Sequence, residues 1–167
     1  MNRTEPDDDP NVIIEALQTY YDIFIIMEDM NYSPRDILTE KFRSALLYAL
    51  DLHADQVRKN KDIPYFAHLL NVTALVMEAG GNEDEVIAAL LHDTVEDQGG
   101  RKRLTEIRER FGPQVARVVD GLTDAYRTPK PPWRERKETY IQDLKSASRS
   151  IVLVSLADKV HNARAIY

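Results

Sequence analysis

Apolar residues recur at helical spacing along most of the chain, and this pattern restricts the fold more than any other feature. The segment from Thr39 to Val57 carries an apolar stripe along one side of a helix, and Thr39 can cap its start. No segment alternates apolar and polar residues over the length of a strand, and the β-branched stretch from Ile151 to Leu153 is too short. The sequence therefore predicts an all-α fold.

Glycine, proline and capping residues divide this helical pattern into segments. Gly80-Gly81 and Gly99-Gly100 are typical helix ends, and Asn82 with Glu85 forms a capping box. The proline-rich segment 127–134 and the polar segment 58–64 are expected to be loops. The predicted helices span residues 39–57, 65–79, 82–97, 104–111, 113–123, 135–145 and 150–166.

The first 37 residues differ from the rest. Residues 1–10 form an acidic tail with little to bury, whereas residues 11–30 have the apolar content of a helix. Because the second half of that helix would be apolar almost all round, it is expected either to be buried or to form a partner surface, of which a homo-oligomer contact is one possibility. We therefore divide the chain into an N-terminal extension, residues 1–37, and a helical domain, residues 38–167.

The composition excludes several classes of protein. With 167 residues, 43% of them hydrophobic, the chain suits one domain with a real core. A net charge of −6 argues against nucleic-acid binding, and no apolar run approaches the ~20 residues of a membrane helix. The absence of cysteine excludes a disulfide framework and thiolate metal ligands. We expect a cytoplasmic protein without membrane contacts, in which histidine supplies any nitrogen ligands.

The densest group of ionisable residues is His92-Asp93-Thr94-Val95-Glu96-Asp97. On one helix, residues three and four apart share a face, so all four ionisable side chains would lie together. Three neighbouring carboxylates repel one another unless a cation lies among them. His92 and Asp93 are therefore candidate metal ligands, and Glu96 and Asp97 are candidate proton acceptors for a metal-bound water. The alternative interpretation is an ordinary solvated helix end.

Two further candidates lie in apolar surroundings. His53 ends the apolar stripe of residues 39–57, which is also typical of a core histidine. Asp158 lies within Leu156-Ala157-Asp158-Lys159-Val160, where an unpaired buried carboxylate would be costly. Two histidines with two carboxylates suit manganese, iron, zinc or magnesium.

Four motifs, in this order, resemble a known family. They are "HADQVRKNKDIPYFAH", "AALLHDTVEDQGG", "FGPQVARVVDGLTD" and "LADKVHNAR". The order of His53, His92-Asp93 and Asp158 resembles the HD-domain metal-dependent phosphohydrolases. The motifs resemble the hydrolase domain of the RelA/SpoT homologue family, in particular its small bacterial alarmone hydrolases. The resemblance covers residues 38–167 and implies an HD-domain bundle of about six to eight helices.

The resemblance also implies an activity and a set of site residues. The activity is manganese-dependent removal of the 3′-pyrophosphate from guanosine 3′,5′-bis(diphosphate) or its pentaphosphate form. Glu96 and Asp97 match the acidic pair that orients and deprotonates the attacking water. The implied metal ligands are His53, His92, Asp93 and Asp158, and the implied substrate contacts include Arg58, Lys59 and Asn162.

Basic residues gather in patches although the chain is acidic overall. Arg134 and Lys137 belong to the run from Arg127 to Lys137 and are expected to contact substrate phosphates, as is the patch Arg58, Lys59 and Lys61. A third patch, residues 101–103, is more simply a solvated face. Asn162 lies one helical turn after Asp158 and would face the same site.

Three other residues are given lesser roles. His68 is interpreted as a core residue or as a hydrogen-bond partner of another site group, and His161 as equally compatible with solvent exposure. Gln98 stands where many relatives carry threonine, and we expect it not to touch the chemistry. The family pattern continues beyond Tyr167, so either the chain is truncated at its C-terminus or the site is left partly uncapped.

Two alternatives to alarmone hydrolysis stay open at this point. The first is an HD-type phosphohydrolase acting on other nucleotides or on 2′- or 3′-phosphorylated cofactors. The second is a nucleotide sensor without catalysis, against which the presence of both Glu96 and Asp97 counts.

Overall fold

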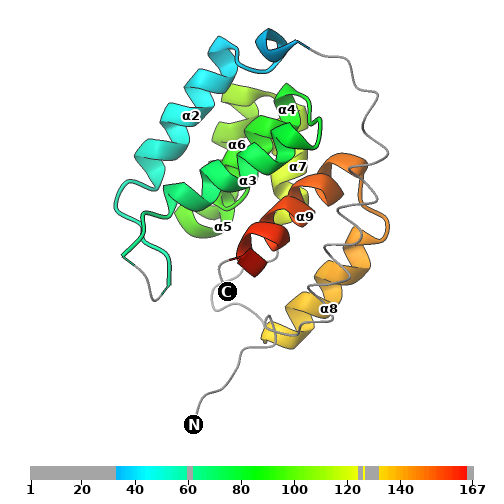
Figure 1. Cartoon of the computed structure of the whole chain (residues 1–167). Helices are drawn as coiled ribbons and strands as arrows, with labels where there is room; N and C mark the ends of the chain where they lie inside the picture. Colours follow the sequence, from blue (N-terminus) through cyan, green and yellow to red (C-terminus); the bar gives the residue numbers. More distant parts are fainter. Residues whose placement is uncertain (1–32, 60–61, 124–125, 127–131, 165–167) are drawn as a thin grey trace.

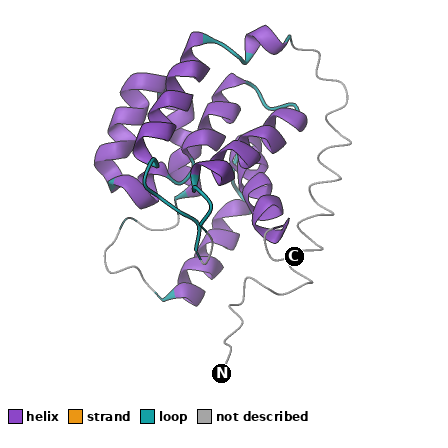
Figure 2. Cartoon of the chain, turned by 60° about the vertical axis from the view of Figure 1, so that its left-hand side comes forward, coloured by secondary structure: helices purple, strands orange, loops and turns teal. Residues whose placement is uncertain are grey.

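The computed structural model describes residues 33–59, 62–123, 126 and 132–164. Figure 2 shows that the chain is helical within these ranges. The only β-type pairing there is a single bridge between Val57 and Pro64. The predicted all-α class is confirmed. The elements are η2 (Pro34–Asp36), α2 (Glu40–Leu52), α3 (Phe66–Glu78), α4 (Glu83–Leu91), α5 (Thr94–Gln98), α6 (Gly100–Phe111), α7 (Pro113–Leu122), α8 (Trp133–Leu144) and α9 (Arg149–Arg164).

Helix α4 is the centre of the bundle. It packs against α2, α3, α7 and α9 (Figure 1), and every residue from Val86 to Leu91 is fully buried. Its sequence is apolar on all sides after the first turn, which is the composition expected of a helix surrounded by others. His92, the residue after α4, therefore lies in the interior of the protein.

Side-chain caps define where the central helices begin, as the sequence predicts. The Thr39 hydroxyl accepts from the backbone amides of Lys41 and Phe42, and Asn82 and Glu85 make both bonds of a capping box. Gly80 ends α3 at a φ of 72°, in the left-handed region that favours glycine.

The predicted helix 82–97 is interrupted in the structure. Helix α4 ends at Leu91, His92 and Asp93 form a turn, and α5 starts at Thr94. Asp93 has φ −92° and ψ −6°, away from ideal α-helical values, and its carboxylate accepts a hydrogen bond from Tyr65, which lies far away in the sequence. The break turns these two side chains into the protein instead of leaving them on one face with Glu96 and Asp97.

Three other boundaries also differ from expectation. Helix α2 ends at Leu52, so His53 is its C-cap and the chain leaves the helix there. Helix α6 starts at Gly100 instead of residue 104, and α8 starts at Trp133, directly after Pro132. Pro132 itself is extended, with φ −51° and ψ 141°, and α8 begins at the next residue.

Some predictions lie outside the described residues. These are the acidic tail, the helix at 11–30 with its role in oligomerisation, and the basic residues Lys61, Arg127 and Lys130. Within the described ranges, no helix has the length and apolarity needed to span a membrane.

Candidate metal centre

Three side chains from different elements meet beside the end of α4. They are His68 from α3, His92 from the turn after α4, and Asp158 from α9. Their nearest ligand atoms all lie within 4.8 Å of one another, and the Nε2 atoms of the two histidines are 3.3 Å apart. Asp158 Oδ1 lies 3.2 Å from His68 Nε2 and 3.7 Å from His92 Nε2.

Asp93 adds a second carboxylate to this group. Its Oδ2 lies 2.9 Å from His92 Nε2 and 3.6 Å from His68 Nε2. The same oxygen accepts a hydrogen bond from the hydroxyl of Tyr65. Burial, followed by the charge of Asp93, raises the pKa of Tyr65 far above its ordinary value, so this tyrosine stays a donor.

The contacts of His92 determine which of its ring nitrogens is free. Nδ1 lies 2.8 Å from the carbonyl oxygen of Ala89, which can only accept, so Nδ1 carries the hydrogen. In the neutral ring, Nε2 therefore directs its lone pair at the cluster. A backbone carbonyl that fixes the distal nitrogen is the usual arrangement of a histidine that ligates a metal.

A longer chain of contacts determines the tautomer of His68. Arg58 Nη1 can only donate, so at 3.1 Å it makes His161 Nδ1 an acceptor. His68 Nδ1, 2.7 Å from the same atom, must then carry its own hydrogen, which leaves the lone pair on Nε2. Burial, followed by the electrostatic effects of His68 and Arg58, lowers the pKa of His161 to about 4, so His161 is neutral at pH 7.

This arrangement fits a divalent cation. Two neutral imidazoles that direct lone pairs at each other across 3.3 Å, beside two carboxylates, need a positive charge between them. Burial lowers the pKa of His92, but the charges of Asp93 and Asp158 outweigh burial and hold the pKa well above 6.5. The same field that favours a proton there favours a metal ion.

The structure places His53 elsewhere. Its side chain is 1% exposed, its Nδ1 lies 2.7 Å from Gln56 Oε1, and its Nε2 lies 3.4 Å from the hydroxyl of Thr94. Both ring nitrogens are thus committed to protein groups, and among the described residues His53 belongs to no group of converging ligands. The cluster contains His68 in the place for which the motif resemblance indicated His53.

Periodicity alone does not distinguish the two histidines. His68 lies on the buried stripe of α3 with Val72 and Val76, and His53 ends the buried stripe of α2. Both occur within the first motif, 15 positions apart in the sequence. The available signal is the position of His68 inside a helix that packs against both α4 and α9, which carry or precede the other ligands.

The predicted acidic pair lies on α5, which follows Asp93 directly. Glu96 is partly exposed and Asp97 is exposed. Asp97 Oδ2 accepts a hydrogen bond of 2.8 Å from Gln56 Nε2. Both side chains of the pair thus reach solvent, on the helix that starts directly after Asp93.

The predicted substrate contacts fall into two groups. Arg58 Nη2 donates to Asn162 Oδ1 at 2.9 Å, and Asn162 Nδ2 donates to Asp158 Oδ1 at 2.7 Å, so both residues adjoin the cluster. Lys59 is exposed on the same loop. Arg134 is also exposed and pairs with Glu138 one helical turn away, as on a solvated face, and the side chain of Lys137 lies outside the described part.

Lys159 is a basic neighbour that the sequence did not single out. Its ammonium lies 2.6 Å from Asp158 Oδ2, the oxygen that faces away from the histidines. Burial raises the pKa of Asp158, but Lys159 and the two histidines outweigh burial and hold this pKa well below its ordinary value. The third basic patch is structural, since Arg101 stacks on Tyr126 and Arg103 donates to Tyr48.

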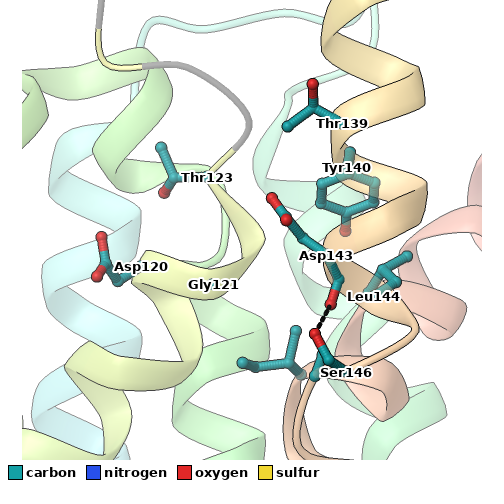
Figure 3. A pocket seen from close by; sticks show the side chains of 10 residues that line it. Asp120, Gly121, Thr123, Thr139, Tyr140, Asp143, Leu144 and Ser146 are labelled. Atoms are coloured by element: carbon teal, nitrogen blue, oxygen red, sulfur yellow. Dashed lines mark hydrogen bonds between the residues drawn. The ribbon is translucent and has the colours of Figure 1, made fainter.

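A pocket of about 280 Å³ lies apart from this cluster, between α7 and α8. Figure 3 shows Asp120 and Thr123 at α7 and Thr139 and Asp143 at α8, and all four line the pocket. None of the cluster residues lines the pocket, and its two carboxylates repel an anionic ligand. The chemistry is therefore assigned to the His–Asp cluster.

The site consists of four side chains: the adjacent His92 and Asp93 after the buried helix α4, His68 from α3 and Asp158 from α9. The HD-domain family matches residues 45–167, which contain all four side chains. The chain belongs to the HD-domain family. The match also includes α5 and the Arg58–Asn162 contact, so the whole candidate site lies within the HD domain.

Individual relatives of this HD domain are consistent with the motif resemblance. The mouse guanosine-3′,5′-bis(diphosphate) 3′-pyrophosphohydrolase MESH1 is 38% identical over 120 residues, which cover 70% of this chain and 64% of the mouse protein. The Aquifex aeolicus protein named guanosine-3′,5′-bis(diphosphate) 3′-pyrophosphohydrolase is 33% identical over 134 residues. The alignment covers 77% of this chain but 18% of the Aquifex protein.

A solved structure shows the same fold. It is that of a metazoan ortholog of SpoT, described as hydrolysing ppGpp. The TM-score is 0.69 at 32% identity, with 81% of this chain and 72% of the other covered. The resemblance to the RelA/SpoT hydrolase domain is thus confirmed, and the chain spans about a fifth of the long bacterial relatives it matches, such as the GTP pyrophosphokinase rsh of Brucella ovis at 18%.

Proposed function

We propose that this HD domain hydrolyses guanosine 3′,5′-bis(diphosphate) at its 3′-diphosphate, with a bound divalent cation. The observation that carries the proposal is the pair of Nε2 lone pairs, from His68 and His92, directed at one point beside two carboxylates. The names of the relatives supply the substrate class, since two of them are named for this reaction.

The proposed ligands are His68, His92, Asp93 and Asp158, and the proposed cation is Mn²⁺. His68 replaces His53 because of the geometry above. Imidazole nitrogen with carboxylate oxygen suits Mn²⁺, although the donor set also accommodates iron, zinc or magnesium. When bound, the cation would supply Lewis acidity and lower the pKa of a bound water.

Glu96 and Asp97 are proposed to orient the attacking water and accept its proton. The water oxygen forms a bond to the phosphorus attached to the 3′-oxygen, and the bond between that phosphorus and the 3′-oxygen breaks. Pyrophosphate leaves, the 3′-oxygen takes up a proton, and guanosine diphosphate remains. Carboxylates that reach solvent can pass the proton on to bulk water.

Arg58 and Asn162 are proposed to bind the substrate beside the cation. Arg58 uses two of its five donors on His161 and Asn162, so others remain for a phosphate. Lys59, Arg134 and Lys137 would add positive charge for a ligand with two diphosphates. A cytoplasmic location and self-association through residues 11–30 complete the proposal.

A panel of phosphorylated nucleotides tests this function. Guanosine bis(diphosphate), its adenosine analogue, and nucleotides with 2′- or 3′-monophosphates are each incubated with protein and Mn²⁺, and products are separated by anion-exchange chromatography. We expect pyrophosphate and guanosine diphosphate from the first. Preferred release of phosphate from a monophosphate would indicate another HD phosphohydrolase, and binding without any product would indicate a sensor.

A further inference from the structure

We propose that Gln56 is a positioning residue that holds the carboxylate of Asp97 for proton transfer, with Gln98 and His53 holding Gln56 in turn. The inference rests on the proposed function, because Gln56 would affect the rate of hydrolysis only through Asp97. It concerns a hydrogen-bond network that joins the loop after α2 to α5, and no residue in it is one of the proposed ligands.

The amide orientation of Gln56 follows from its partners. Asp97 Oδ2 can only accept, so the atom 2.8 Å from it is the amide nitrogen of Gln56. Gln56 Oε1 is then the acceptor for both of its remaining contacts, His53 Nδ1 at 2.7 Å and Gln98 Nε2 at 2.9 Å. Reversing the Gln56 amide would place its oxygen against Asp97 Oδ2 and its NH₂ group against the NH₂ group of Gln98.

The same contacts determine the state of His53. Its Nδ1 donates to Gln56, so Nε2 accepts from the hydroxyl of Thr94, which is fully buried at the start of α5. The ring stacks on Tyr65 with centroids 5.6 Å apart. The His53 side chain therefore links Gln56, in the loop after α2, to Thr94 at the start of α5.

The backbone of Gln56 is fixed as well. Its amide donates to the carbonyl oxygen of His53 at 3.1 Å, and its carbonyl oxygen accepts from the amide of Tyr65 at 2.7 Å. Both main-chain bonds tie it within the loop between α2 and α3. The amide that donates to Asp97 thus belongs to a residue whose backbone is held in place by two hydrogen bonds.

An exposed aspartate needs such a partner if it is to act on a water molecule. Asp97 is exposed on the five-residue helix α5, where an isolated carboxylate samples several rotamers. The bond from Gln56 occupies Oδ2 and leaves Oδ1 for the water. Pre-orienting a reacting group in this way raises kcat, because a displacement of about 1 Å can cost on the order of 100-fold in rate.

Three variants and a matched control test the inference. Gln56→Met keeps the length of the side chain and removes the donor, whereas Gln56→Glu places a second carboxylate against Asp97. Gln98→Met removes one of the two donors to Gln56 Oε1. Gln142→Glu makes the same chemical change as Gln56→Glu on the exposed face of α8, where Gln142 accepts from Lys145. For each protein, kcat, KM, the Kd for Mn²⁺ and the melting temperature are measured.

We expect Gln56→Met to lower kcat about 10-fold with KM and the Mn²⁺ Kd near wild-type values. Gln56→Glu lowers kcat further, Gln98→Met lowers it less, and Gln142→Glu leaves it unchanged. An unchanged kcat in Gln56→Met, with the wild type active, overturns this inference and leaves the proposed function standing. A parallel loss of Mn²⁺ affinity also overturns it, because Gln56 would then act through the metal. A wild type without turnover overturns the proposed function and this inference together.

Discussion

His68 Nε2 and His92 Nε2 face each other at 3.3 Å, and hydrogen bonds on the far side of each ring assign both lone pairs to the space between them. His92 is fixed by a backbone carbonyl within its own helical turn, whereas His68 is fixed by Arg58 through His161, from two other parts of the chain. This pair, with the two carboxylates beside it, is the basis for the metal chemistry proposed above.

The first prediction separates the two histidines of the first motif. His68→Ala should abolish stoichiometric binding of Mn²⁺ and turnover, because it removes a ligand. His53→Ala should retain bound metal, since both nitrogens of that ring contact protein groups. Metal content after dialysis, measured by atomic emission, tests this. Loss of metal in His53→Ala with full occupancy in His68→Ala would reverse the assignment.

The second prediction concerns His161, which accepts the hydrogen of His68 Nδ1. His161→Phe removes this acceptor and should weaken Mn²⁺ binding about 10- to 100-fold, the usual effect of losing a partner of a metal ligand. His161→Asn keeps an acceptor oxygen near the position of Nδ1 and should restore most of the affinity. Calorimetric titration with Mn²⁺ measures both. Equal affinity in the two variants would mean that the acceptor does not matter.

The third prediction concerns Glu96 on α5. Glu96→Gln keeps the shape of the side chain and removes a proton acceptor, so kcat should fall about 100-fold or more while Mn²⁺ still binds. Stopped assays with a parallel metal titration separate the two effects. If metal and activity disappeared together, Glu96 would belong with the ligands instead.

The fourth prediction is a pH dependence of the metal-free protein. Burial lowers the pKa of His92, but Asp93 and Asp158 hold it well above 6.5 in the folded chain. Because the folded pKa is the higher one, the stability it contributes is present below pH 6.5 and is lost as the pH rises through the folded pKa. Urea unfolding in a chelator should therefore give a lower free energy of unfolding at about pH 9 than at pH 6.5.

His92→Gln is the control for that experiment. Without a titrating ring at this position, the decline of stability above pH 6.5 should flatten. A wild-type decline that persists unchanged in His92→Gln would assign it to another group.

Much of the fold follows from local sequence signals. The caps Thr39 and Asn82, and the helix end at Gly80, act on their immediate neighbours, and each lies where the sequence predicts. The helix break at His92–Asp93 does not follow from local signals, because the side chains that contact these two residues are distant in the sequence. Tyr65 reaches the Asp93 side chain from the loop before α3, and Asp158 reaches His92 from α9.

Part of the site's geometry agrees with the motifs. His92, Asp93 and Asp158 lie close together, and Arg58 and Asn162 meet beside them, while their roles stay predictions. The choice between His53 and His68 depends on which ring faces α4 and α9, which spacing does not encode. Gln98, expected not to touch the chemistry, instead donates to Gln56 beside Asp97, a contact across 42 residues of sequence.

The most direct test of the whole account is pyrophosphate release by metal-stripped protein. The purified chain is dialysed against a chelator and mixed with guanosine 3′,5′-bis(diphosphate), first alone and then with Mn²⁺. The account predicts no product without metal, and equal amounts of pyrophosphate and guanosine diphosphate once Mn²⁺ is added. Release that does not depend on added metal, or no release with any divalent cation, would contradict it.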